Sequence, residues 1–276
     1  MFSAAVAGFV GAFSDKIIAL DATLKLGACG NPIGAYVVAL FTIEIVSLYA
    51  GKTKLDILIV PLGTLFLSYA GCFLAYPFIF LVGKLGVLIS EATKITPFFM
   101  GIIISVVMGI LLTMPTSSAA IWFSVASVVT DDAMLIAGGA AVVGCSCHMI
   151  GFAVASFREN GVSGLISQGI GTSMLQIPNI MKKPAIMLPE IISSAILGPI
   201  STCVFGLKCN ATGGGMGTSG LVGVFGTIDA SAGMNPVVLT LGIALLMFIL
   251  PAALSFGFSE LFRKVGLIKF GDQKLD

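Results

Sequence analysis

Long apolar runs separated by short polar links make up most of the chain. Several runs are close to the length of a helix that crosses a bilayer, which needs about 20 predominantly apolar residues. These runs are Ile33–Ala50, Ile57–Gly83, Phe98–Met114, Met134–Phe157, the run from Pro189 to about Phe205, and Pro236–Phe256. Prolines open several of them, as is typical of the first helical turn, where the missing N–H would have no partner. The pattern predicts an all-α, polytopic membrane protein.

Other stretches do not fit a simple span. Phe2–Phe13 is apolar but too short to cross alone, and Ile17–Leu26 is amphipathic. The first run lacks the basic start of a signal peptide, so we do not interpret it as one. We expect Lys84–Thr96 to be a polar, partly helical connector. Arg158–Leu188 is predicted to form a long amphipathic stretch.

Two interruptions lie within apolar surroundings. Pro115–Ala120 is small and polar, and apolar residues follow at once. Gly206–Asn235 contains a glycine cluster and is too apolar for a free loop. Non-helical backbone at membrane depth must be buried in protein or line a cavity. We therefore expect about 7–10 membrane segments in one domain over 1–276, with broken or re-entrant segments near 113–120 and 208–225, and a short cytoplasmic tail over 258–276.

Composition supports this class and excludes others. Of the 276 residues, 57% are apolar and 10% are charged, and the mean hydropathy is +1.10. A soluble domain carries about 25% charged residues. Soluble enzymes, secreted disulfide scaffolds and disordered proteins are thus excluded. The net charge of +1 argues against nucleic acid or another polyanion as a partner.

The distribution of lysine and arginine predicts the orientation. With alternating sides and the basic C-terminus in the cytoplasm, eleven of the fourteen basic residues are cytoplasmic. These are Lys16, Lys25, Lys84, Lys94, Arg158, Lys182, Lys183, Arg263, Lys264, Lys269 and Lys274. Lys52, Lys54, Lys208 and the acidic pair Asp131-Asp132 then lie outside.

The two interruptions are also the best candidates for a binding site, because paired broken segments often mark transporter sites. Free N–H and C=O groups at such breaks, together with hydroxyls, can hold a polar solute. The candidates are Pro115, Thr116, Ser117, Ser118, Asn210, Gly215, Gly217, Thr218 and Ser219. The alternative is that both breaks are tight turns or notches for helix packing.

Three ionisable residues in apolar segments are further candidates. Glu44 lies within a predicted span, where a carboxylate is costly and often functional; the alternative is a structural partner. His148, the only histidine, is a candidate substrate contact or a packing residue. A metal site is not favoured, because no second acidic or histidine ligand lies near it in the sequence. Glu190 follows a proline, which favours a first-turn acid stabilised by the helix dipole. No cofactor is expected.

Several motifs resemble one known family. They are Met114–Ile121 (MPTSSAAI), Gly151–Val154 (GFAV), Pro178–Met181 (PNIM), Ile196–Phe205 (ILGPISTCVF) and Gly214–Gly223 (GGMGTSGLVG). The chain is similar to the enzyme IIC-like membrane family of the phosphotransferase system, which includes the perfringolysin O regulator. The resemblance implies a sugar-permease fold, a homodimer in a bacterial plasma membrane, and a separate soluble IIB-type protein, because the chain leaves no room for a IIA or IIB domain.

The sequence therefore favours a permease that binds a small polar solute, most simply a sugar or sugar derivative, at the bilayer midplane and moves it by alternating access. A membrane sensor that binds a solute or lipid without transporting it is the alternative. A membrane-embedded enzyme is the weakest interpretation, since no catalytic constellation is present.

Overall fold

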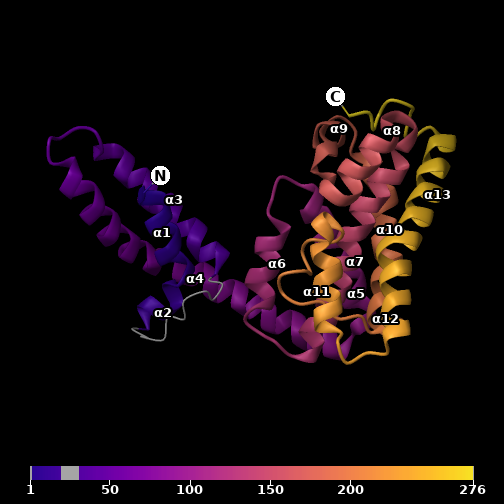
Figure 1. Cartoon of the computed structure of the whole chain (residues 1–276), viewed down its shortest axis with the longest axis horizontal. Coiled ribbons are helices and arrows are strands. Elements are labelled where there is room, and N and C mark those ends of the chain that lie inside the picture. The colour runs from indigo at the N-terminus through magenta and orange to yellow at the C-terminus, as the bar shows by residue number, and fades with distance from the viewer. Residues whose placement is uncertain (1, 20–30, 276) are drawn as a thin grey trace. The chain divides into compact units, whose positions relative to one another are not determined.

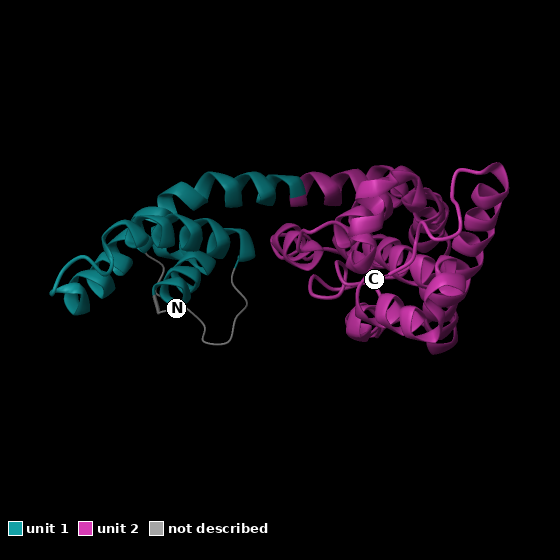
Figure 2. Cartoon of the chain, turned by 90° about the horizontal axis from the view of Figure 1, so that it is seen from above, with its two compact units in different colours: residues 1–85 teal, residues 86–276 magenta. Residues whose placement is uncertain are grey.

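The computed structural model describes residues 2–19 and 31–275 and divides into two compact units, 1–85 and 86–276 (Figure 2). Every regular element in these described ranges is helical. Five helical stretches are long and apolar enough to cross a membrane: Pro32–Tyr49, Asp56–Ile95, Asp132–Ala155, Pro184–Phe205 and Pro236–Val265. Shorter apolar helices occupy Ser3–Ala12, Pro97–Thr113 and Ser219–Ala230. The prediction of an all-α polytopic membrane protein is confirmed.

The first unit contains α1 (Phe2–Ala12), α2 (Ser14–Ile18), α3 (Pro32–Tyr49) and most of α4 (Asp56–Ile95). Asn31 caps α3, since its Oδ1 accepts hydrogen bonds from Ile33 N at 3.0 Å and Gly34 N at 3.2 Å. The small buried core comprises Ala7, Val38, Cys72 and Ala75. Most of the predicted amphipathic segment Ile17–Leu26 lies outside the described residues.

The second unit is a bundle around α7 (Asp132–Ala155), which is buried along nearly its whole length. Helices α5 (Pro97–Thr113), α10 (Leu188–Pro199) and α13 (Leu250–Val265) pack against it (Figure 1). A π-helical turn at Ile200–Phe205 continues α10. A second π-helical turn, Ala244–Ile249, joins α12 (Pro236–Ile243) to α13. Glycines allow the close contacts: a Cβ on Gly144 of α7 would collide with the Ser105 backbone of α5.

Two segments enter the bundle and return to the same end. After α5, the chain turns at 114–117 and comes back as α6 (Ser118–Ala126). The return is marked by an ion pair of 2.8 Å between Lys94 Nζ, which lies before α5, and Asp131 Oδ2, which lies after α6. The second segment starts at Lys208 and returns through α11 (Val222–Ala230) to Ser231. Ser231 Oγ accepts from Lys208 N at 3.2 Å. Both predicted interruptions are therefore re-entrant.

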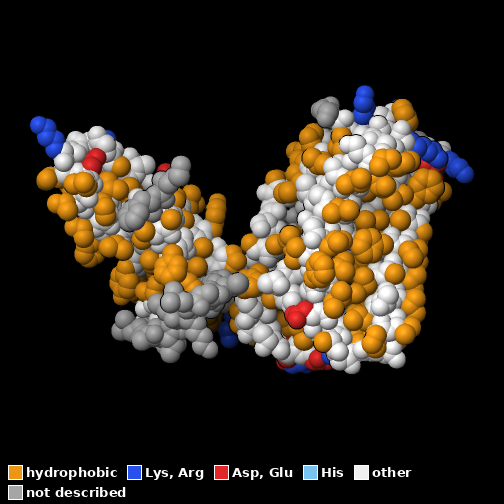
Figure 3. Space-filling model, viewed as in Figure 1, with side chains coloured by type: hydrophobic (Ala, Val, Ile, Leu, Met, Phe, Trp, Pro, Cys, Tyr) orange, Lys and Arg blue, Asp and Glu red, His pale blue; other side chains and the backbone are white. Residues whose placement is uncertain are grey.

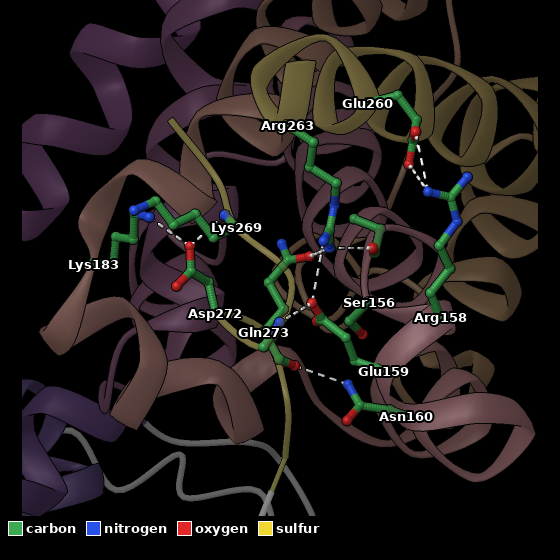
Figure 4. Close-up of polar contacts among 12 residues, drawn as sticks. Ser156, Arg158, Glu159, Asn160, Lys183, Glu260, Arg263, Lys269, Asp272 and Gln273 are labelled. Atoms are coloured by element: carbon green, nitrogen blue, oxygen red, sulfur yellow. Dashed lines mark hydrogen bonds and ion pairs between the residues drawn. The ribbon is translucent and has the colours of Figure 1, made fainter. Parts of the chain in front are cut away.

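The opposite end of the bundle carries a charged and amide-rich cluster. Here α8 (Phe157–Ile166), α9 (Ile177–Lys182) and short 3₁₀ and π turns replace the predicted continuous amphipathic stretch. Arg263 Nη1 pairs with Glu159 Oε1 at 3.1 Å, and Lys183 Nζ with Asp272 Oδ2 at 2.5 Å (Figure 4). Gln273 O accepts from Asn160 Nδ2 at 2.9 Å. The segment predicted as a tail is thus helical to Val265 and then packs on α8 and α9; its cytoplasmic location stays a prediction.

Two details of the sequence interpretation are wrong. Lys84–Thr96 is not a connector, because α4 is one helix of 40 residues that continues to Ile95. Regular apolar positions such as Leu85 and Leu88 extend the helical pattern past the lysine. Lys94 and Asp131 were assigned to opposite sides, yet their ion pair places them at the same end of the bundle.

Charged side chains of the second unit gather at its two ends, and apolar side chains cover the flank between them (Figure 3). Seven of this unit's nine basic residues lie at or beyond the C-terminal ends of α7, α9 or α13: Arg158, Lys182, Lys183, Arg263, Lys264, Lys269 and Lys274. The other end has Lys94 and Lys208 beside Asp131 and Asp132. This distribution suits a bundle that crosses a bilayer.

Candidate functional site

A pocket of ≈ 360 Å³ lies where the two re-entrant segments meet. The end of α5, the α5–α6 turn, the glycine-rich loop before α11 and the chain before α9 all contribute to it. Its lining residues are Leu112, Pro115, Thr116, Ser117, Ser118, Ala119, Thr172, Met174, Met216 and Ser219. Ligand pockets commonly measure about 300–1,000 Å³, so this pocket suits a small solute.

The glycine-rich loop reaches the pocket about halfway along α7. Gly217 lies against the backbone of Cys145, and Thr218 Oγ1 is 3.6 Å from Met149 Sδ. Since α7 runs from Asp132 to Ala155, these contacts lie just past its midpoint. In a bilayer that α7 crosses, the pocket would be near mid-depth.

Only glycine permits the loop to pass this close to its neighbours. Gly217 has a positive φ of 55°, and a Cβ there would come within 2.8 Å of the Cys145 backbone. A Cβ on Gly215 would lie 2.6 Å from Ser118 O. Left-handed backbone and close approach are the two situations that favour glycine most strongly. The glycine cluster thus fits one wall of the pocket between α6 and α7.

Hydroxyl groups on the pocket wall are held by the backbone. Ser118 Oγ donates to Gly215 O at 2.7 Å, Thr116 Oγ1 to Leu111 O at 2.9 Å, and Ser219 Oγ to Gly171 O at 2.9 Å. Ser117 Oγ instead accepts from Ala120 N at 3.2 Å and caps α6. A hydroxyl that donates keeps lone pairs for accepting. The wall can therefore accept hydrogen bonds from a solute with its oxygens already oriented.

His148 lies behind the pocket in a buried polar chain. Its Nδ1 is 2.9 Å from Thr113 Oγ1, which is 3.1 Å from Ser173 Oγ. The ring fills the space above Gly109 of α5, and among the described residues its Nε2 has no hydrogen-bond partner. Thr113 follows the lining residue Leu112, and Ser173 lies between the lining residues Thr172 and Met174. His148 can therefore influence the pocket wall through them, but it does not line the pocket.

The remaining predicted residues are placed differently. Thr218 is buried and donates to Gly169 O at 2.6 Å. Asn210 shapes the loop, because its Oδ1 accepts from Gly213 N at 2.9 Å and its Nδ2 donates to Asp229 Oδ2 at 3.0 Å. Glu44 is exposed on α3 in the first unit and is not part of this pocket. Roles for these residues in binding stay predictions.

Sequence reasoning missed part of the lining. Thr172 and Met174 belong to Arg158–Leu188, which was predicted to be a long amphipathic stretch, and Leu112, Ala119 and Met216 were not singled out. A signal for Thr172 was present in Gly169–Ser173 (GIGTS), which has the same mixture of glycine and hydroxyl residues as the two recognised breaks. The methionine and leucine positions carry no such signal, because apolar residues are common throughout the chain.

The lining combines hydroxyl groups with apolar surface. None of the described residues that line the pocket is charged. Serine and threonine oxygens can bind hydroxyl groups, while Leu112, Pro115 and the two methionines offer apolar surface. A molecule with both hydroxyl groups and C–H faces matches both kinds of surface.

Comparison with known proteins gives one match. Residues 1–275 match the sequence model of the family described as "Phosphotransferase system, EIIC". No curated protein and no solved structure matches the chain.

Proposed function

The chain belongs to the EIIC family of the phosphotransferase system, and from that premise we propose that it is a permease for a small polar solute, a sugar or sugar derivative. The observation that carries the proposal is the uncharged, hydroxyl-lined pocket formed by the two re-entrant segments near the middle of α7. Pro115, Thr116, Ser117, Ser118 and Ser219 would bind the solute, with Gly215 and Gly217 holding the wall.

Alternating access follows from how the two segments are anchored. Both enter from the end that carries Lys94 and Lys208 and return to it. A rigid-body movement of these segments against α7, α10 and α13 would expose the pocket first to one end and then to the other. The solute would move without the helices unfolding.

The proposal includes an assembly and an orientation. The permease would form a homodimer in a bacterial plasma membrane and work with a separate soluble IIB-type protein. Its C-terminal end would be cytoplasmic, because positively charged residues are retained on that side and seven of nine in the second unit gather there. A dependence of uptake on the IIB-type protein would distinguish phosphotransferase uptake from secondary transport.

A thermal-shift screen of the purified full chain against sugars, sugar phosphates, polyols and nucleosides tests the proposal. A ligand that binds only the folded protein at a hundredfold excess over Kd stabilises it by about 2.7 kcal/mol. We expect Ser219→Ala to weaken binding of the stabilising solute by roughly tenfold, since one oriented hydrogen bond contributes about 0.5–1.5 kcal/mol. Ser167→Ala is the control, because that hydroxyl donates to Ser163 O outside the pocket.

Each result has a clear meaning. A solute that stabilises the wild type and the control but binds Ser219→Ala less well supports the permease site. Equal binding by all three proteins contradicts the site. No stabilisation by any compound, with the protein shown to be folded, would favour a sensor that responds to a lipid or protein.

A further inference from the structure

Glu190 is a fully buried carboxylate in the second unit, away from the pocket lining. It occupies the first turn of α10 and points to the contact with α7 and α13. A Cβ placed on Gly151 of α7 would lie 2.9 Å from Glu190 Cγ and 2.6 Å from Ser255 Oγ of α13. The carboxylate therefore lies at the meeting point of three helices.

Among the described residues, neither carboxylate oxygen of Glu190 has a hydrogen-bond partner. The hydroxyls nearby are committed elsewhere: Ser255 Oγ donates to Ser193 Oγ at 3.1 Å, and Ser193 Oγ donates to Pro189 O at 2.7 Å. An ionised carboxylate without a partner is very costly in a low-dielectric interior. A neutral carboxylic acid is the form that this site tolerates.

The charged and titratable groups around Glu190 do not offer a counter-ion. On α7, Cys147 faces α10 and His148 is bonded to Thr113 of α5. Helix α5 and the 3₁₀ turn Pro184–Met187 have no titratable side chain. On α13, Glu260 pairs with Arg158 and Arg263 pairs with Glu159. Lys183, just before that turn, pairs with Asp272.

Polar side chains on one face of α13 lie between Glu190 and the charged end of the bundle. Ser255, Ser259 and Arg263 are spaced four residues apart and thus share one face of α13. Both serines are buried, and within the described chain Ser259 Oγ has no hydrogen-bond partner. Arg263 pairs with Glu159 at the end of this face, near the C-terminus (Figure 4). Among the described residues no hydrogen bond links Ser255, Ser259 and Arg263, so they form a polar face that entering water can follow and not a continuous hydrogen-bonded chain.

We propose that Glu190 is a proton-binding site that is neutral in this packed state and exchanges its proton with water that enters from the C-terminal end of the bundle past Ser255 and Ser259. Uptake converts the carboxylate and one proton from hydronium into a carboxylic acid, and release returns the proton to water. Movement of α10 away from α7 and α13 would allow release.

Infrared spectroscopy of the purified full chain at pH 7 tests the proton directly. We expect wild type to show the carbonyl stretch of a protonated carboxylic acid, Glu190→Gln to lose it, and Glu91→Gln to keep it. Glu91 is an exposed carboxylate paired with Lys94 and is a matched control. We expect Ser259→Ala to slow the shift of this band after transfer to D₂O, because water would then have to enter along a more apolar face of α13.

A second measurement covers the case in which Glu190→Gln does not fold. Unfolding exposes Glu190 to water, where it loses its proton, so raising the pH favours the unfolded state. The melting temperature of wild type should fall as the pH rises from 5 to 8. An absence of the acid band from wild type at pH 7, or its persistence in Glu190→Gln, overturns the proposal. Because neither measurement needs a solute, failure of the thermal-shift screen and failure of this proposal are distinguishable.

Discussion

At the residue scale, the polar side chains at the two breaks have structural roles beside the binding roles proposed for them. Ser117 caps α6, and Ser118 joins α6 to the glycine-rich loop through Gly215 O. Asp131, just before α7, also makes two kinds of contact. Its Oδ1 caps α7 by accepting from Met134 N at 3.0 Å, and its Oδ2 accepts from Ser90 Oγ at 2.7 Å. Substituting such a residue removes several contacts at once.

The carboxylate of Asp131 should stabilise the bundle down to acidic pH. Hydrogen bonds from Lys94 and Ser90 lower its pKa to about 2. A lowered pKa gives stability that is present above the unfolded value of about 3.9 and is lost as the pH falls towards 2. Asp131→Asn keeps a good N-cap but loses the charge, so we expect it to cost below about 1 kcal/mol at pH 7, because this pair is partly exposed.

Thermal unfolding between pH 7 and pH 2 checks this prediction. The difference in melting temperature between wild type and Asp131→Asn should shrink below pH 4. Asp131→Ala, which also removes the cap, should lose a further ~0.5–2 kcal/mol that does not depend on pH. A constant difference between wild type and Asp131→Asn across this range would show that the charge contributes nothing.

At the scale of elements, helix starts were predictable and long-range packing was not. Asn31-Pro32, Pro97 and Pro236 mark helix starts because capping and proline geometry are local properties, and α3, α5 and α12 begin there. The hydroxyl-rich breaks were also visible in the sequence. The share of Thr172 and Met174 in the pocket and the position of Glu190 between α7 and α13 depend on contacts between distant segments, which no local pattern contains.

Close packing of α5 on α7 gives a test at this scale. Gly144→Ala would drive a Cβ into the Ser105 backbone, so we expect the helices to separate and stability to fall by about 1–3 kcal/mol. Gly257→Ala is the matched control, because nothing lies within 4 Å of the added Cβ on α13. That control should be neutral or stabilising by up to about 1 kcal/mol. Equal melting temperatures for the two variants would contradict the packing argument.

At the scale of the whole molecule, the ion pairs define the two ends of the second unit. Lys94 with Asp131 and Lys208 with Asp132 mark one end, while Arg263 with Glu159 and Lys183 with Asp272 mark the other. This grouping moves Lys94 to the end that carries Lys208, so the charge bias in the second unit falls from eight of nine basic residues to seven of nine but keeps its direction. An end with seven basic residues faces an end where two lysines are matched by aspartates.

The charge bias predicts how the protein is oriented in the membrane. Thr130 is exposed beside Asp131, and Lys274 is exposed at the C-terminal end. With Cys203, an exposed cysteine, changed to alanine, Thr130→Cys should react with a membrane-impermeant maleimide on intact cells. Lys274→Cys should react only after the membrane is permeabilised, because basic residues are retained in the cytoplasm. Labelling of the parent without either new cysteine gives the background. The reverse pattern would place the C-terminal cluster outside, and the water that exchanges protons with Glu190 would then be extracellular.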